Sequence, residues 1–391
     1  MALKMDRAAA VAVIKTIRLS LFFMAVFFLA CQSVIAAVLP EERADVLYHS
    51  YDGGGVEVSG PSILVRKGFN ESISASANYY VDTISSASID VMTTASPYAE
   101  ERIEKSVSMD YLHANTTMSL GYTISDENDY HAKTVAFNLS QELFGNMTNV
   151  TMGYALADDV VEKRSDATFS RDVKRHQFRA GVSQILSKSL IADFAFETVS
   201  DEGYLNNPYR SVRYLDAGNL NGYSYESEVY PRTRISNAVA GRVMYYLPYR
   251  ASIHLESRIF NDSWGITANH YQIGYSHAYQ GRWIFDLTYR AYSQTKADFY
   301  SDLFAYRQAQ NFLARDKELS TFDSITLGLG VSYEFLYDAQ YIDKASVNFK
   351  YSRIAFDYKD FRDLTSSATA GTEPFYAFTA NVIQLYFSAW Y

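Results

Sequence analysis

The chain has 391 residues, with 35 lysines and arginines against 44 aspartates and glutamates, for a net charge of −9. That acidity argues against a nucleic-acid partner. Its one cysteine, Cys31, excludes a disulfide framework and a thiolate metal site, and 33 Tyr and 24 Phe against 7 Pro favour strands over disorder.

The amino end has the order of a secretory signal, in which basic residues precede an apolar core and a small-residue cleavage site. The basic residues are Lys4, Arg7, Lys15 and Arg18. An apolar run at 19–30 follows, then Ala36 and Ala37, so we predict a signal peptide over 1–36 that is cleaved near 36/37. A lipoprotein signal ending at Cys31 is the alternative, but Phe28 and Leu29 suit lipidation poorly.

Residues 37–68 come next and carry the glycines of DGGG (52–55) and Pro61. We interpret this stretch as an N-terminal periplasmic or lumen-entry segment because glycine and proline weaken a strand. A single domain over 69–391 follows, without tandem repeats or low-complexity linkers.

Apolar and polar residues alternate in that domain with a period of two, which indicates strands. In one run Ile73, Ala75 and Ala77 alternate with serines, and in another Ile325, Leu327 and Leu329 alternate with threonine and glycines. No apolar stretch after the signal is long enough to cross a bilayer as a helix. Because backbone polar groups in hydrocarbon need partners, a membrane protein of this kind must be a closed barrel.

The connections alternate between short and long, as in an outer-membrane barrel with short periplasmic turns and long extracellular loops. Short turns are predicted at 113–115, 143–146, 187–189, 247–250, 279–282 and 337–340. The fold class is therefore all-β, a transmembrane antiparallel up-and-down β-barrel of about 14 strands. The expected strands lie near 70–83, 104–113, 115–125, 131–143, 146–157, 174–187, 189–200, 232–247, 249–261, 266–279, 281–294, 322–337, 342–357 and 376–391.

Sixteen strands is the alternative count, reached by adding 62–69 and 87–95 as a pair. An even number places both ends of the chain in the periplasm. The chain stops on Tyr391, with Ile383, Leu385 and Phe387 on the same strand face, which is the pattern that the outer-membrane assembly machinery reads.

Charged residues that alternate with the apolar set are expected to face the lumen, because Arg or Lys costs about 2–4 kcal/mol at the lipid midplane. This predicted lumen-lining set comprises Arg179, Asp193, Glu197, Arg234, Arg242, His254, Glu256, Arg258, His270, Asp286, Arg290 and Glu334. Both signs are present, so two interpretations stay open: a salt-bridged lumen that holds shape and water, or a pathway that selects a solute by charge.

No catalytic, cofactor or metal residues are predicted. His254, Glu256 and Arg258 share one face, but no GxSxG turn and no HExxH motif accompany them. Aspartates in the runs 297–302 and 314–318 are conceivable calcium ligands, with solvated loop charge as the simpler interpretation.

Two long loops, 201–214 and 297–319, are too aromatic for disorder. They fold into the lumen as a constriction, cover the mouth, meet a partner, or pack on each other as a lid; the sequence leaves these alternatives open.

Several long runs resemble a bacterial family of predicted outer-membrane proteins that is known only as a domain of unknown function. These runs include YDGGGVEVSGPSILVRK, SASANYYVDTISSASIDVMTTASPYAEER, DEGYLNNPYRSVRY, YPRTRISNAV, YYLPYRA, ADFYSDLF and NFLARDKELSTFDS. The resemblance spans roughly 45–391; it implies a barrel and no site residues.

We therefore expect a non-enzymatic protein in the outer membrane of a Gram-negative bacterium, surrounded by lipid and inserted by the barrel-assembly machinery through its C-terminal strand. The first functional hypothesis is a porin-like passage or conduit scaffold for a small solute or a periplasmic protein partner. The second is a closed structural or adhesive barrel whose ordered loops bind an extracellular partner, and an outer-membrane hydrolase is a minor third.

Overall fold

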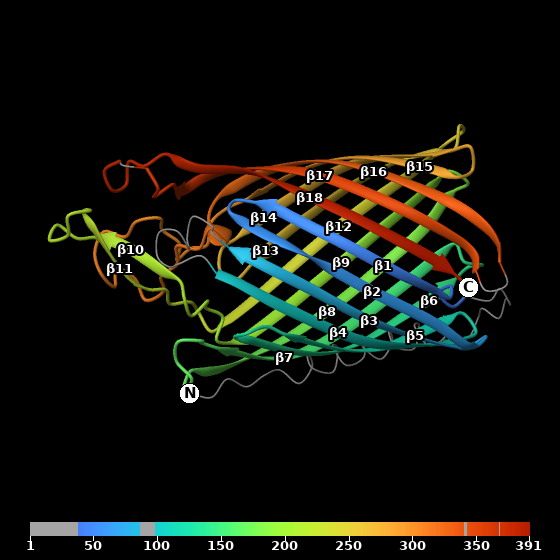
Figure 1. Cartoon of the computed structure of the whole chain (residues 1–391), viewed down its shortest axis with the longest axis horizontal. Helices are drawn as coiled ribbons and strands as arrows, with labels where there is room; N and C mark the ends of the chain where they lie inside the picture. The colour runs from blue at the N-terminus through green and yellow to red at the C-terminus, as the bar shows by residue number, and fades with distance from the viewer. Residues whose placement is uncertain (1–37, 87–97, 340–341, 367) are drawn as a thin grey trace, which may run out of the picture.

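The computed structural model describes residues 38–86, 98–339, 342–366 and 368–391, and these form a closed antiparallel barrel of sixteen strands. The predicted signal peptide and Cys31 lie outside the described residues. The barrel strands, which are tilted in Figure 1, are β1 (Arg43–Gly53), β2 (Val56–Asn70), β3 (Ile73–Ser86), β4 (Tyr98–His113), β5 (Thr116–Asp126), β6 (Tyr130–Leu143), β7 (Thr148–Glu162), β8 (Ser170–Ser187), β9 (Leu190–Gly203), β12 (Thr233–Leu247), β13 (Ala251–Asp262), β14 (Thr267–Tyr279), β15 (Trp283–Gln294), β16 (Phe322–Ala339), β17 (Ile342–Arg362) and β18 (Phe375–Trp390).

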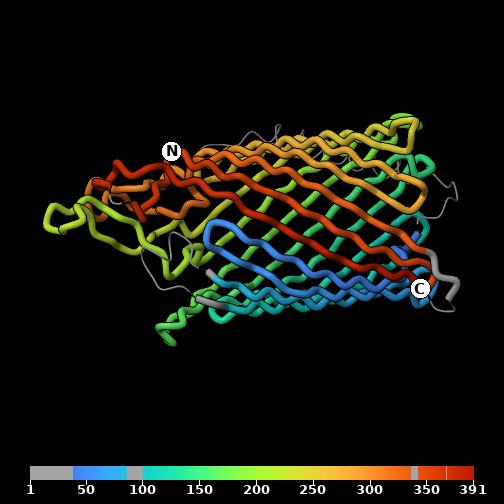
Figure 2. The backbone as a smooth tube through the Cα atoms, turned by 45° about the horizontal axis from the view of Figure 1, so that its top comes forward, coloured from blue at the N-terminus to red at the C-terminus, as the bar shows by residue number. Residues whose placement is uncertain are grey.

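The all-β barrel is confirmed, with sixteen strands, the alternative count, in place of the favoured fourteen. The two additional strands are β1 and β2, which join β18 to β3 and close the sheet. Figure 2 shows the blue β1 lying beside the red β18. Residues 62–69 belong to β2 as the alternative required, and β2 pairs with β1 on one side and β3 on the other, whereas 87–95 lies outside the described residues.

The interpretation of 37–68 as an entry segment is wrong, because β1 and most of β2 occupy it in the barrel wall. Gly54 and Gly55, with φ of 60° and 76°, form the tight turn that joins these strands. Pro61 pairs with Tyr48 of β1 on one side. On the other side Pro61 has no partner in β3, because the paired residues there are Ser59 and then Ser62. Glycine and proline therefore mark a turn and a local gap in the ladder, not the absence of a strand.

The predicted tight turns lie together at one end, which we call the short-turn end, and the carboxyl terminus lies there too (Figure 1). Five residues other than glycine adopt positive φ in these turns: Ala114, Phe144, Asn146, Arg250 and Gln280. At the opposite, long-loop end, a small two-stranded sheet stands beyond the barrel, formed by β10 (Ser211–Leu215) and β11 (Tyr223–Ser227). A 3-10 turn, η1 (Lys317–Leu319), lies in the β15–β16 connection.

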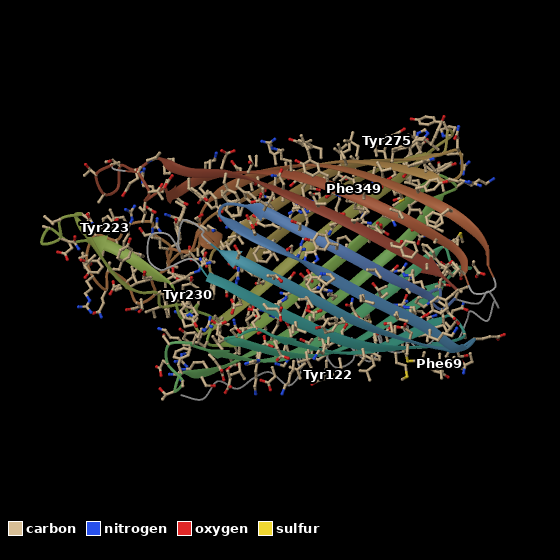
Figure 3. The ribbon with its side chains drawn as sticks, viewed as in Figure 1. Phe69, Tyr122, Tyr223, Tyr230, Tyr275 and Phe349 are labelled. Carbon is tan, nitrogen blue, oxygen red and sulfur yellow. The ribbon has the colours of Figure 1, made fainter. Side chains whose placement is uncertain are left out.

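The outer face of the wall is apolar and exposed. Leu120, Phe137, Phe194, Leu255 and Leu329 each expose 45% or more of their surface, and Tyr122 projects from the outside of the barrel in Figure 3. Side chains alternate along each strand, so their neighbours point into the barrel. No helix in the described part of the chain is long and apolar enough to cross a membrane.

Candidate functional site

The inner face of the wall carries the whole predicted lumen-lining set. The strand register runs continuously from Arg179 to Glu197, Ala238 and Phe260 and places the twelve residues on this one face. The later strands continue it, with Glu256 opposite Gln272, Gln272 opposite Arg290, and Arg290 opposite Thr326. Most of the exposed apolar side chains of these strands occupy the alternate positions.

Five of these residues form ion pairs at mid-height, and Gln177 donates a hydrogen bond to one of them. Arg179 Nε donates to Glu197 Oε2 at 2.7 Å, and Arg258 Nη2 donates to Glu197 Oε1 at 2.8 Å. Gln177 Nε2 also donates to Glu197 Oε2, at 2.9 Å. Nearby, Arg242 Nε donates to Glu256 at 3.1 Å. Both oxygens of Glu197 are thus occupied by donors from two strands.

Two further pairs lie closer to the long-loop end. Arg234 donates to Asp262 from Nε at 2.8 Å and approaches it from Nη2 at 2.6 Å, and Arg175 Nε donates to Asp201 at 2.6 Å. The lumen-lining set predicted from the sequence did not include Arg175, Asp201 and Asp262, because these residues fall at or beyond the ends of the expected strands. Their positions, four residues from Arg179, Glu197 and Arg258 respectively, would have placed them on the same face.

The other predicted residues are not brought into ion pairs. Among the described residues, Asp193, Arg290 and Glu334 have no ion-pair partner, and Asp286 accepts a hydrogen bond from Ser276 Oγ at 2.5 Å. The His254 ring lies over Gly274, where an added Cβ would come within 1.9 Å of the His254 Cε1 atom. His270 lies opposite Arg258 in the register, with a Nε2 atom that is buried without a hydrogen bond. The arrangement is therefore one of arginines and carboxylates, without a histidine dyad.

A cavity of about 230 Å³ opens on this wall between β8, β9, β12 and β13. Arg175, Gln177, Asp201, Arg234 and Ser236 contribute its polar lining, and Glu197 and Phe260 also reach it. Its size suits a small organic molecule, and its two arginines provide donors for oxyanions.

Above the cavity lies a compact structure that we call the loop cap, made of residues 204–232, 263–266, 295–321, 363–366 and 368–374. Its apolar core contains Tyr230, Trp264, Phe299 and Leu319, and the inward-facing Phe260 packs against it. Arg234 stacks on the Trp264 ring with 4.6 Å between guanidinium and centroid. The inward-facing Gln294 of β15 donates to the Glu318 and Ser320 carbonyls. The cap therefore rests on the inner rim of the wall, directly beside the cavity.

An ionic cluster joins the three long loops of the cap. Arg213 of β10 is fully buried and donates to the carboxylates of Asp302 and Glu373, which belong to different loops. Arg315 also contacts Asp302, at 3.0 Å, and the Arg362 side chain donates to the Glu373 carbonyl. Of the alternatives left open for the loops, packing on each other as a lid is the arrangement observed.

Glu228 is a further buried acid of the cap. It accepts hydrogen bonds from the Tyr230 hydroxyl and the Arg315 backbone N–H, both at 2.7 Å. Burial, with the nearby charge of Asp316, raises the pKa of Glu228 from 4.5 to about 7. By contrast, hydrogen bonds from Arg213 hold the pKa of Glu373 below its usual value, against the opposing effect of burial.

Calcium ligation by the loop aspartates is not supported, because Asp302 and Asp316 are paired with arginines. One group of three carboxylates in the described residues has a geometry open to a cation: Glu100, Glu127 and Asp129, with oxygens within 4.8 Å of one another. An acidic group of this kind is common without an ion, and we assign no metal to it.

A family model described as "Protein of unknown function (DUF3570)" matches residues 88–180 and 163–355. A comparison with curated proteins finds no match.

Among solved structures, the chain is similar to the siderophore receptor PirA from Pseudomonas aeruginosa, with 9% identity, a TM-score of 0.43 and coverage of 90% of this chain and 63% of the receptor. It is similar to CdiB from Acinetobacter baumannii, with 10% identity, a TM-score of 0.46 and coverage of 89% and 60%. A bacterial polysaccharide outer membrane secretin has 7% identity, a TM-score of 0.49 and coverage of 90% and 100%. The chain thus spans about 60% of the length of the first two, and these likenesses transfer no function to it.

Proposed function

Since the chain belongs to the DUF3570 family of proteins of unknown function, we propose from its own geometry that it is an outer-membrane barrel whose lumen passes small hydrophilic solutes. The proposal needs no catalytic step and no cofactor.

The outer face supports the membrane location. Its strands have 11 to 21 residues, enough to cross a bilayer at a tilt, which takes about 9–11. Most of the exposed side chains along their outer face are aliphatic and aromatic, as a lipid-facing surface requires. The expected signal peptide over 1–36 would direct the chain out of the cytoplasm. We propose that the assembly machinery reads β18, whose Ile383, Leu385 and Phe387 point outward.

One observation supports the passage above all others: several basic side chains that point into the barrel are accessible to solvent. The Arg179 side chain is 64% exposed although it is attached to the inner face. Barrels of 16 strands are wide enough for an aqueous channel, and a lumen packed with side chains would not leave an arginine so accessible.

The test is single-channel recording of purified residues 38–391 in planar bilayers. We expect discrete conductance steps. A matched pair of variants identifies the route: Thr288→Cys on the inner face, and Leu287→Cys beside it on the outer face, where Leu287 is 51% exposed. A charged thiol reagent should lower the conductance of the first variant and leave the second unchanged. If neither the wild-type protein nor the Arg213→Met variant, which is expected to loosen the loop cap, shows any conductance, the passage is rejected.

A closed barrel whose loops bind a partner is the second candidate, and the loop cap favours it. The cap rests on the inner rim through Phe260 and Gln294 and exposes Leu220, Tyr306 and Phe312 to solvent. A silent wild-type protein combined with a conducting Arg213→Met variant would favour this closed state, held shut by the cap.

A further inference from the structure

Basic and acidic side chains on the inner face of the barrel differ in how far they are exposed to solvent. On the inner face of the described strands, the exposed charged side chains are all basic: Arg43, Arg171, Arg175, Arg179, Arg242, Arg290 and Lys350. The acidic side chains of that face are half-buried or buried. A solute in the lumen therefore meets cations first, even though the wall holds charges of both signs.

The ion pairs produce this difference through their geometry. Arg175 is 47% exposed against 10% for its partner Asp201, and Arg242 is 48% exposed against 20% for Glu256. Arg175, Arg179 and Arg242 donate from Nε, the nitrogen closest to the chain. Their terminal Nη1 and Nη2 groups donate no hydrogen bond within the described residues, so they can donate to a ligand. Arg290 has no ion-pair partner in the same part of the chain.

The cavity of about 230 Å³ adds a place where such a ligand can be held. Arg175 and Arg234 approach it from β8 and β12, and Ser236 and Gln177 add neutral hydrogen-bonding groups. Its two carboxylates are already occupied, Asp201 by Arg175 and Glu197 by Arg179, Arg258 and Gln177. A guanidinium presents paired N–H donors that match carboxylate and phosphate oxygens.

We infer that this wall is a binding track for small oxyanions, carboxylates or phosphates, that begins at the cavity between Arg175 and Arg234 and continues past Arg179, Arg242 and Arg290. The inference rests on the proposed passage and names the class of solute that it carries.

The test has two independent readouts. In the first, calorimetry measures binding of succinate and, separately, inorganic phosphate to detergent-solubilised protein at low salt. In the second, the reversal potential in a KCl gradient measures the preference for Cl⁻ over K⁺. Arg290→Gln removes a cation without breaking an ion pair, so we expect this variant to fold like the wild-type protein. A combined Arg175→Gln, Arg179→Gln and Arg242→Gln variant removes the three guanidinium groups that donate from Nε.

We expect the wild-type protein to bind at least one of the two anions and to prefer Cl⁻. The combined variant should bind at least about tenfold more weakly, as loss of charged hydrogen bonds implies. Lys174→Gln is the control, because Lys174 is next to Arg175 in β8 and points to the opposite face. Arg→Lys replacements at the three combined positions keep the charge and should restore the Cl⁻ preference with weaker binding.

The outcomes separate the two proposals. Conductance without anion preference, together with no binding of either anion, overturns the oxyanion track and leaves the passage intact. Anion binding that the arginine replacements abolish, in a protein that never conducts, supports the track and rejects the passage. Binding of succinate alone or phosphate alone supports the track and decides which oxyanion it takes.

Discussion

Arg258 of β13 reaches across β12 to donate to Glu197 of β9 at 2.8 Å. Ala238 and Ala240 are the inner-face residues of β12 opposite these two, and their small side chains leave room for the long guanidinium. Because Arg179 of β8 bonds the same carboxylate, one glutamate links β8 and β13 across the two strands between them.

Glu197→Gln removes the negative charge that Arg179 and Arg258 share. The change should therefore strengthen the preference of the channel for anions. The arginines are 64% and 42% exposed, so solvent screens both pairs and the expected loss of stability is about 1 kcal/mol. The reversal potential and the urea midpoint of the protein in vesicles measure the two effects. An unchanged or more cation-selective reversal potential would contradict the role assigned to the exposed arginines.

Arg213→Met should loosen the loop cap and leave the barrel folded. The replacement leaves Asp302 and Glu373 buried without their cation, and breaking a buried pair in this way costs about 3–5 kcal/mol. Limited proteolysis should cut within 204–232 or 295–321, while the barrel keeps its heat-modifiable migration on gels. Arg307→Met is the matched control, since Arg307 is 69% exposed and lies 3.8 Å from Glu226. Equal protease resistance of both variants would show that the cluster does not hold the cap.

The loop cap should lose stability as the pH rises through about 7. The pKa of Glu228 is raised from 4.5 to about 7. Its contribution is therefore fully present below about 4.5, declines above that, and is lost as the pH rises past 7. Glu373, with a lowered pKa, behaves in the opposite way, and its contribution is lost only as the pH falls below about 4.5. Arg210, Asp316, the Arg315 N–H and the Tyr230 hydroxyl surround Glu228.

Trp264 reports on this equilibrium because its ring packs against Tyr230 with 5.6 Å between centroids. With Trp283 and Trp390 replaced by Phe, its fluorescence should show cap unfolding at lower urea at pH 8.5 than at pH 5.5. Glu228→Gln should remove most of that difference. A difference that survives the replacement would assign the pH dependence to another group.

A cysteine pair tests the closure of the barrel by β1. Val46 lies opposite Phe387 of β18, and Phe387 lies opposite Val347 of β17. Residues 38–391 contain no cysteine. Val46→Cys with Phe387→Cys should therefore form a disulfide under mild oxidation, visible as a mobility shift, because directly opposed Cβ atoms lie about 4.5–5.5 Å apart. Val46→Cys with Val347→Cys should not, since a strand separates them. Equal cross-linking of the two pairs would refute this register.

Local patterns in the sequence were enough to predict fourteen of the strands, the tight turns and the inner face. A strand's side chains alternate with a fixed period, so Ile325, Leu327 and Leu329 had to face away from Thr326. The same rule put all twelve predicted charged residues on one face. The turn predictions succeeded because the chain can reverse in two or three residues only with local conformations such as those of Ala114 and Arg250.

The sequence by itself therefore determined a barrel wall with an apolar and a charged face. Only the tertiary structure decided that β1 and β2 complete the wall, that Arg258 passes over Ala240 to Glu197, and that Arg213 gathers Asp302 and Glu373 from two other loops. The physical reason is distance along the chain: the ion pairs join residues 61 to 160 positions apart, and Arg43 of β1 lies opposite Trp390 of β18. They depend on strand register and loop packing, which no local period encodes.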